Sequence, residues 1–243
     1  MSDVIQMYGG ELVFDEGKHC YTFNGKPVPG VTTILGRLAK PALVPWASKM
    51  AADTFLKCMK SGRTDLDEVY KESKDAHKKR LKDAGDSGTN VHAYAEAYLK
   101  RLPLPDLETD EAKRGAEAFH KWLDAHKVEV LASERRVFSR EHSYAGTCDL
   151  VARIDGRLAV GDFKTGSGIY PEMRFQTAAY QHAMQEEKDM RFECRWIIRF
   201  DKKNGKFEAK CFEEFDLDFQ GFCAAMVLHK VLKTIETKKA EVW

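Results

Sequence analysis

The segment spanning residues 146–166 reads GTCDLVARIDGRLAVGDFKTG, and its centre predicts a β-hairpin. The dipeptide Asp155-Gly156 lies between two runs of β-forming residues, a pattern that favours a two-residue type I′ turn. A turn at this place fixes the register of the two antiparallel strands. That register places Asp149 directly opposite Asp162, so the sequence predicts two opposed carboxylates.

Two opposed carboxylates need a compensating cation. Directly opposite side chains in an antiparallel pair have Cβ atoms about 4.5 to 5.5 Å apart, and like charges there destabilise the sheet. Mg²⁺ is commonly held by one or two carboxylates, and Lys164 lies two residues beyond Asp162 on the same face. The alternative is an exposed ion pair worth at most about 1 kcal/mol. The apolar run 158–161 before Asp162 favours a strand end instead, where sites lie in open α/β sheets.

Three further patterns accompany this hairpin. In GTNVHAYAE (residues 88–96), His92 and Glu96 are four residues apart and share one helical face, although a lone helical histidine is commonly structural. Gln176 and Tyr180 repeat that spacing on a later predicted helix. Glu134 lies on the strand-like segment before the hairpin. Each of these patterns alone is weak evidence for a functional site.

Composition excludes several classes of protein. The chain has 243 residues, of which 43% are hydrophobic and 32% charged, which is typical of a folded soluble protein. No apolar run approaches the roughly 18 to 20 residues that span a bilayer, so we expect an intracellular, cytoplasmic protein of a bacterium or a phage-infected host. The six cysteines form no CxxC pair, which argues against a zinc or iron–sulfur site. A formal charge of +1 leaves a locally basic cleft possible.

The remaining periodicity predicts one α/β domain over residues 1–243, with an N-terminal hairpin and helical portion (1–85) and a catalytic core (86–243). Gly85-Asp86-Ser87-Gly88 is expected to interrupt the helical pattern. The expected elements are a hairpin over 11–23, helices over 46–60, 64–83, 89–100, 110–126, 171–187 and 219–237, and strands over 128–138, 147–164, 191–200 and 207–212.

The ordered set GTxVHxxxE, E, GTxDLV, GDFKTG and QxxxY resembles the PD-(D/E)xK nuclease superfamily, in its RecB-like exonuclease branch, which includes the mitochondrial genome-maintenance exonuclease. PGVTTIL (residues 29–35) followed by Pro45-Trp46 is similar to the opening of mitochondrial-type members and of many phage proteins. The resemblance covers about residues 27–182. It implies a restriction-endonuclease-like fold, a mixed central sheet flanked by helices. The iron–sulfur cysteine set of the CRISPR-adaptation nucleases is missing, so no cluster is expected.

The resemblance also implies roles for individual residues. Asp149, Asp162, His92 and the Phe163 carbonyl would hold one or two Mg²⁺ or Mn²⁺ ions. Lys164 would orient or activate the attacking water and stabilise the charge that develops on the phosphate. Gln176 and Tyr180 would position the DNA strand or support Lys164, and Glu96 is a further catalytic candidate. DNA contacts are expected from Arg135, Arg136, Tyr144, Arg174, Lys202 and Lys203.

These features predict a metal-dependent DNA exonuclease that acts on single strands or duplex ends. A phage-type role in recombination or genome processing is expected, with a recombination or single-strand-binding protein as a possible partner and no membrane association. A structure-specific or nicking endonuclease is the alternative on the same site. A catalytically silent nucleic-acid-binding module is the alternative of another class, and a carboxylate-pair glycosidase is remote because its chemistry needs no Asp-x-Lys.

Overall fold

A computed structural model describes residues 2–188 and 190–240. The chain divides into two compact units, residues 39–90 and the remainder on either side of them. The larger unit contains every residue of the predicted site, because it resumes at Val91. That the whole chain acts as one nuclease domain stays a prediction.

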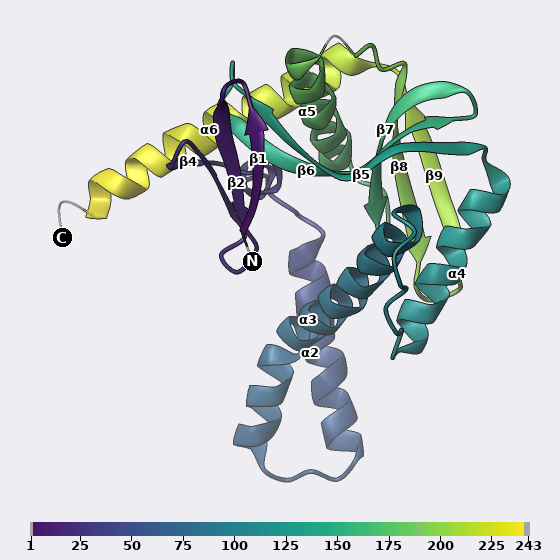
Figure 1. Ribbon diagram of the computed structural model, residues 1–243. Helices are drawn as coiled ribbons and strands as arrows, with labels where there is room; N and C mark the ends of the chain where they lie inside the picture. Colours follow the sequence, from purple (N-terminus) through teal and green to yellow (C-terminus); the bar gives the residue numbers. More distant parts are fainter. Residues whose placement is uncertain (1, 189, 241–243) are drawn as a thin grey trace. The chain divides into compact units, whose positions relative to one another are not determined.

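The larger unit is built on a five-stranded mixed sheet (Figure 1). Its strands lie in sequence order, with β7 and β8 parallel and all other neighbours antiparallel. The strands are β5 (Val128–Ser139), β6 (Tyr144–Ile154), β7 (Arg157–Lys164), β8 (Cys194–Asp201) and β9 (Lys206–Phe212). The mixed α/β fold expected from the resemblance is confirmed.

The predicted hairpin is present between β6 and β7. Asp155 and Gly156 have φ angles of 52° and 86°, as both central residues of a type I′ turn require. The register runs from Ile154 opposite Arg157 to Leu150 opposite Gly161, which confirms the predicted pairing over these residues. The described ladder ends there, one step before the two aspartates.

Helices cover both faces of this sheet. One face packs against α1 (Val31–Leu35), α5 (Pro171–Glu187) and α6 (Phe215–Ala240), with Val151 and Val160 in the shared core. The other face packs against the end of α3 and against α4 (Asp110–Ala125), with Leu150 and Ala159 in that core. Neighbouring residues of a strand therefore enter opposite cores, as the twofold period of a strand requires.

A second, antiparallel sheet precedes the central one and extends the predicted 11–23 hairpin at both ends. Its strands are β1 (Ser2–Met7), β2 (Gly10–Asp15), β3 (Cys20–Phe23) and β4 (Lys26–Val28). Phe23 stacks on Phe138 at a ring-centroid distance of 4.3 Å, and the Tyr21 hydroxyl lies 2.7 Å from the Thr147 hydroxyl. The small sheet thus packs against β5 through Phe138 and is hydrogen-bonded to β6 through Thr147.

Residues 39–90 form a helical unit from α2 (Leu43–Lys60) and the first part of α3 (Leu66–Leu99). The expected interruption at Gly85–Gly88 is wrong, because α3 runs through it without a break. Glycine inside a helix costs only about 1 kcal/mol relative to alanine, and the Thr89 hydroxyl donates to the Gly85 carbonyl at 3.1 Å. In the part of the chain that the structure describes, no helix combines the length and apolarity needed to cross a bilayer.

Candidate active site

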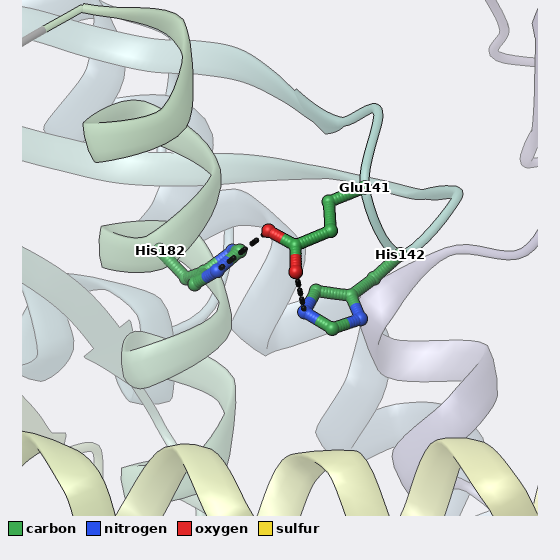
Figure 2. Close-up of side chains that lie close together, drawn as sticks. All are labelled: Glu141, His142 and His182. Atoms are coloured by element: carbon green, nitrogen blue, oxygen red, sulfur yellow. Dashed lines mark ion pairs between the residues drawn. The ribbon is translucent and has the colours of Figure 1, made fainter.

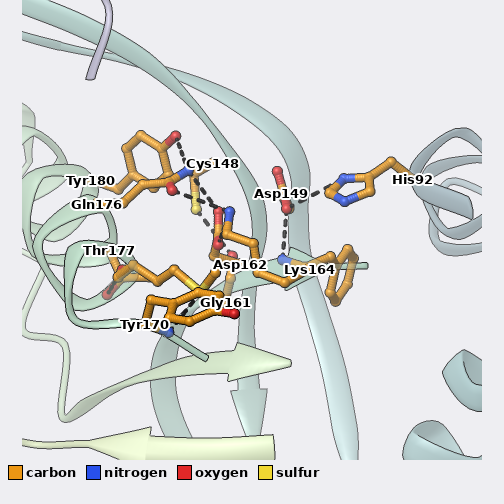
Figure 3. Close-up of polar contacts among 12 residues, drawn as sticks. His92, Cys148, Asp149, Gly161, Asp162, Lys164, Tyr170, Gln176, Thr177 and Tyr180 are labelled. Atoms are coloured by element: carbon orange, nitrogen blue, oxygen red, sulfur yellow. Dashed lines mark hydrogen bonds and ion pairs between the residues drawn. The ribbon is translucent and has the colours of Figure 1, made fainter. Parts of the chain in front are cut away.

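The site begins where the β6–β7 ladder stops. One Asp149 carboxylate oxygen accepts a hydrogen bond from the Phe163 backbone N–H at 2.7 Å (Figure 3). This hydrogen bond comes from the β7 backbone at the residue after Asp162, and it fixes the position of the Asp149 carboxylate relative to both strands. The sequence predicted that Asp149 lies opposite Asp162, and this bond holds it beside that position.

Asp162 is fully buried and has two partners on one side of the sheet. Its Oδ1 accepts a hydrogen bond from Gln176 Nε2 at 2.9 Å. Its Oδ2 lies 2.5 Å from the Lys164 ammonium, yet it accepts no hydrogen bond of acceptable geometry from the described residues. Among the described residues, this buried oxygen is therefore stabilised by its ion pair with Lys164 and by no hydrogen bond.

Gln176 connects the strand residues to helix α5. Its Nε2 donates to Asp162 and also to the Tyr180 hydroxyl at 2.9 Å, while its Oε1 accepts from Lys164 at 3.1 Å. Tyr180 is itself buried, and a Cβ atom at Gly146 would lie 2.6 Å from its ring. The glycine of the GTxD motif is required here because only a residue without a side chain allows Tyr180 to approach β6.

Burial disfavours the charged form of both Asp149 and Asp162. Burial raises the pKa of Asp162 to about 6, against the opposing effect of the Lys164 ammonium and with a contribution from Asp149. Burial also raises the pKa of Asp149, again against Lys164. For Lys164 burial acts to lower the pKa, but the two carboxylates outweigh it and the pKa is raised. The ammonium therefore stays charged at neutral pH.

His92 approaches the site from α3, on the other side of Asp149 from Gln176 and Tyr180 (Figure 3). Its Nδ1 lies 3.7 Å from an Asp149 carboxylate oxygen. Burial, followed by the charge of Lys164, lowers the pKa of His92 to about 4. A neutral imidazole at neutral pH is the form that binds a metal ion.

Glu134 is a further acidic neighbour, which the sequence placed on a strand without a definite role. Ser133 pairs with Leu150 and Arg135 pairs with Cys148, so Glu134 lies opposite Asp149 across β5 and β6. Its φ of 54° is unusual for a residue other than glycine. Burial, then Asp149 and Glu96, raise its pKa to about 8.

The register that places Glu134 was not available from the sequence. β5 and β6 are joined by a longer turn than β6 and β7, and that turn carries no diagnostic dipeptide.

Glu96, predicted as catalytic, lies close enough to Glu134 to contribute to the raised pKa of that residue, and it forms an ion pair with Lys100 at 2.5 Å.

The side chains expected to contact DNA are engaged within the protein. Tyr144 is fully buried and donates to the Ala179 carbonyl at 2.8 Å, so the expected stacking on a base is wrong for this structure. Arg174 pairs with Asp218 at 2.9 Å and lies over the Phe212 ring. Both residues stabilise the packing of α5 on its neighbours.

The two arginines of β5 are similarly occupied. Arg135 pairs with Glu187 at 2.8 Å. Arg136 pairs with Asp3 at 3.2 Å and lies over the Phe14 ring of the N-terminal sheet. Lys202 is buried, whereas Lys203 is exposed. Contact with DNA stays a prediction for Arg135, Arg136, Arg174 and Lys203.

Comparison with known proteins decides the family. The family model of the PD-(D/E)XK nuclease superfamily matches residues 51–239 of this chain. The chain belongs to this superfamily. The resemblance that the motifs suggested is confirmed at that level.

Solved structures similar to this member of the superfamily include two of the alkaline exonuclease LHK-Exo from Laribacter hongkongensis. One, in complex with dAMP, has a TM-score of 0.37, and the other has a TM-score of 0.32. In both comparisons the sequence identity is 10%, and the match covers 64% of this chain and 86% of the exonuclease. Among curated proteins, no relative matches.

PD-(D/E)XK nucleases use divalent metal ions, and the residues of this member fit one. Carboxylate oxygens are the ligands that hard cations prefer, and Asp162 Oδ2 is buried without a hydrogen bond. Burial raises the pKa of both Asp149 and Asp162 despite the nearby Lys164 ammonium, so this one positive charge does not fully offset the burial of two carboxylates. Asp149 and Asp162, with neutral His92 beside them, are the residues that would hold the ion.

Proposed function

We propose that this superfamily member is a DNA exonuclease that depends on Mg²⁺ or Mn²⁺ and acts on single strands or duplex ends. The observation that carries the proposal is the linked set of Asp149, Asp162, Lys164 and Gln176 at one end of β7. The choice of an exonuclease rests on the similarity of the ordered motifs to the RecB-like branch. The same similarity supports a place in phage-type recombination or genome processing.

Phosphodiester hydrolysis forms a bond from a water oxygen to phosphorus and breaks the bond to a 3′ or 5′ oxygen, which leaves with a proton. Bound Mg²⁺ or Mn²⁺ supplies a polarised water and neutralises the phosphate oxygens. Asp149 and Asp162 would hold the ion, with His92 and the Phe163 carbonyl completing the protein ligands. The bond from Phe163 N–H to Asp149 fixes the peptide that precedes that carbonyl.

Lys164 is assigned to charge stabilisation. Its raised pKa keeps the ammonium protonated, so it is poorly suited to remove a proton from water in the metal-free site. A fixed positive charge next to the reacting phosphate stabilises a transition state that becomes more negative. Gln176 holds this ammonium through its Oε1, and Tyr180 holds Gln176.

The decisive experiment is digestion of end-labelled single- and double-stranded DNA with Mg²⁺, with Mn²⁺ and with a chelator. The wild-type chain should release mononucleotides or short products from ends when either ion is present. The Asp162→Asn variant, prepared in parallel and confirmed to be folded, should release none. No cleavage by the wild type under any of these conditions would favour a silent nucleic-acid-binding module.

Circular DNA distinguishes exonuclease from endonuclease on the same site. A covalently closed circle has no ends, so an exonuclease should leave it intact while it degrades linear DNA. Cutting of closed circles at a rate comparable with linear DNA would replace the exonuclease assignment with an endonuclease, while the residues in the site would keep their roles.

A further inference from the structure

A second group of possible metal ligands lies outside the acidic site. Glu141 and His142 belong to the turn between β5 and β6, and His182 lies on α5. Figure 2 shows the Glu141 carboxylate between the two imidazoles. Its two oxygens lie 3.8 Å from His142 Nε2 and 4.0 Å from His182 Nε2, and one ligand atom from each residue falls within 4.8 Å of the others.

The hydrogen bonds of Tyr144 define the tautomer of His182. The single hydroxyl proton of Tyr144 is donated to the Ala179 carbonyl at 2.8 Å. The contact of 3.3 Å between that hydroxyl and His182 Nδ1 must therefore have the imidazole as donor. With its proton on Nδ1, His182 directs the lone pair of Nε2 towards Glu141.

A lone pair and a carboxylate oxygen thus face each other without a hydrogen atom between them. Zn²⁺ binds imidazole nitrogen and carboxylate oxygen at about 2.0 to 2.2 Å, so tetrahedral ligands are about 3.4 Å apart. The observed separations of 3.8 and 4.0 Å need only a small side-chain movement to reach this geometry. Burial, and then the neighbouring His142, lower the pKa of His182.

The turn that carries two of the ligands is already fixed. The Glu186 carboxylate, one helical turn after His182, accepts hydrogen bonds from the backbone N–H groups of Arg140 and Glu141 at 2.8 and 3.0 Å. It also accepts one from the Ser139 hydroxyl at 2.7 Å. This network holds the turn against α5 without any metal ion.

The His182 ring is fixed in the same way. It stacks on Phe219 of α6 at a ring-centroid distance of 4.1 Å and an interplanar angle of 9°. The Tyr144 hydroxyl orients the other edge of the ring, and a hydrogen bond to the second nitrogen is the usual support of a metal-binding histidine. Ligand positions that are set in advance reduce the entropy lost on binding.

We propose that Glu141, His142 and His182 form a binding site for a borderline transition-metal ion of the Zn²⁺ class, separate from the Mg²⁺ or Mn²⁺ site. Two histidines and one carboxylate are a ligand set typical of zinc. The Glu141 side chain is 67% exposed, so water can reach the carboxylate and could supply a fourth ligand. The ion would join the β5–β6 turn to α5, the helix that also carries Gln176 and Tyr180.

The test is a titration of the full chain with Zn²⁺ by calorimetry and with Co²⁺ by visible absorption. The Asp149→Asn/Asp162→Asn double variant, in excess Mg²⁺, serves as the parent, so that the acidic site does not contribute. We expect one equivalent of Zn²⁺ to bind, and Co²⁺ to give the visible spectrum of a four-coordinate ion without thiolate bands. Binding should raise the melting temperature of this parent.

Single substitutions in this parent identify the ligands. Glu141→Gln, His142→Gln and His182→Gln should each weaken Zn²⁺ binding by about 100-fold or more, since loss of a supporting residue alone costs about 10- to 100-fold. Tyr144→Phe should fall within that smaller range. His19→Gln, which removes an exposed histidine, should have no effect.

Two results would overturn the proposal. One is unchanged Zn²⁺ affinity in Glu141→Gln, an exposed substitution that leaves the fold intact. The other is thiolate absorption that disappears in Cys223→Ser, because that would assign the bound ion to Cys223, whose pKa is raised by burial and then by the charge of the neighbouring Glu141. Neither readout depends on DNA cleavage, so failure of this proposal and failure of the proposed nuclease activity are distinguishable.

Discussion

Gln176 on α5 donates a hydrogen bond to Asp162 on β7 at 2.9 Å, and the same side chain accepts one from Lys164 at 3.1 Å. One amide therefore sets the positions of both charged groups of the Asp-x-Lys motif. Because the amide is buried and its two N–H groups and its oxygen all have partners, its orientation is fixed by hydrogen bonding. The helix thus controls the geometry of the strand end.

Gln176→Met should reduce the rate of DNA cleavage by about 10- to 100-fold, the range expected for a residue that orients catalytic groups. Affinity for DNA should change little, because Gln176 makes its contacts within the protein. Single-turnover rates and binding measurements check the two parts. Gln181→Met, a buried substitution on the same helix, is the control and should retain the wild-type rate.

Asp149→Asn and Asp162→Asn should each abolish cleavage, because each removes a carboxylate that would hold the metal ion. The melting temperature of the metal-free protein should hold or rise, since each variant removes a buried charge whose pKa is raised by burial. Cleavage assays in Mg²⁺ and thermal melts in a chelator test this prediction. Wild-type turnover by either variant would contradict the assignment of the site.

The sequence predicted the parts of the site that local chemistry controls. The Asp155-Gly156 turn set the register of β6 against β7, and the four-residue spacing placed Gln176 and Tyr180 on one face of a helix. These features depend on a tight turn and on helical geometry, which act over a few residues. The order of the motifs then identified the superfamily.

Tertiary packing decided what the sequence left open. Glu134 lies opposite Asp149 through a register that no short turn specifies, and Tyr144, expected to stack on a base, is buried in the core. Arg136 and Arg174 form ion pairs with Asp3 and Asp218, partners that are distant in sequence and that no local pattern predicts. The glycine pair near residue 85 failed as a helix stop because a small propensity penalty does not overcome a long helix.

His92→Ala should raise the concentration of Mg²⁺ or Mn²⁺ needed for half-maximal cleavage by about tenfold or more, if the imidazole binds the ion. Its melting temperature should change little. His120→Ala is the control. It removes a histidine that is hydrogen-bonded to Tyr94 and is not part of the proposed metal site, so it should leave the metal titration unchanged. An unchanged metal requirement in His92→Ala, with a lower melting temperature, would make His92 a structural residue.

The stability of the metal-free protein should depend on pH through Asp162 and His92 in opposite ways. The pKa of Asp162 is raised from 3.8 to about 6, so the folded state binds more protons and this carboxylate destabilises the fold increasingly as pH rises from about 4 to 6. The pKa of His92 is lowered from 6.5 to about 4, so its destabilising effect grows as pH falls from 6.5 to 4.

Thermal melts in a chelator separate the two contributions. The melting temperature of Asp162→Asn relative to the wild type should increase with rising pH between about 4 and 6 and then level off. For His92→Gln the difference should instead increase with falling pH below 6.5. A difference that is independent of pH in both variants would show that neither group has a displaced pKa.

Lys164→Met should separate DNA binding from cleavage. The ammonium lies 2.5 Å from Asp162, where it would act on the reacting phosphate under the proposed mechanism, whereas most DNA affinity comes from contacts spread along the backbone. Loss of one such charge is expected to reduce the single-turnover rate in Mg²⁺ by about 10²- to 10³-fold. Affinity measured in Ca²⁺ should stay near the wild-type value. Weakened binding with an almost unchanged single-turnover rate would instead make Lys164 a phosphate anchor and remove it from the chemical step.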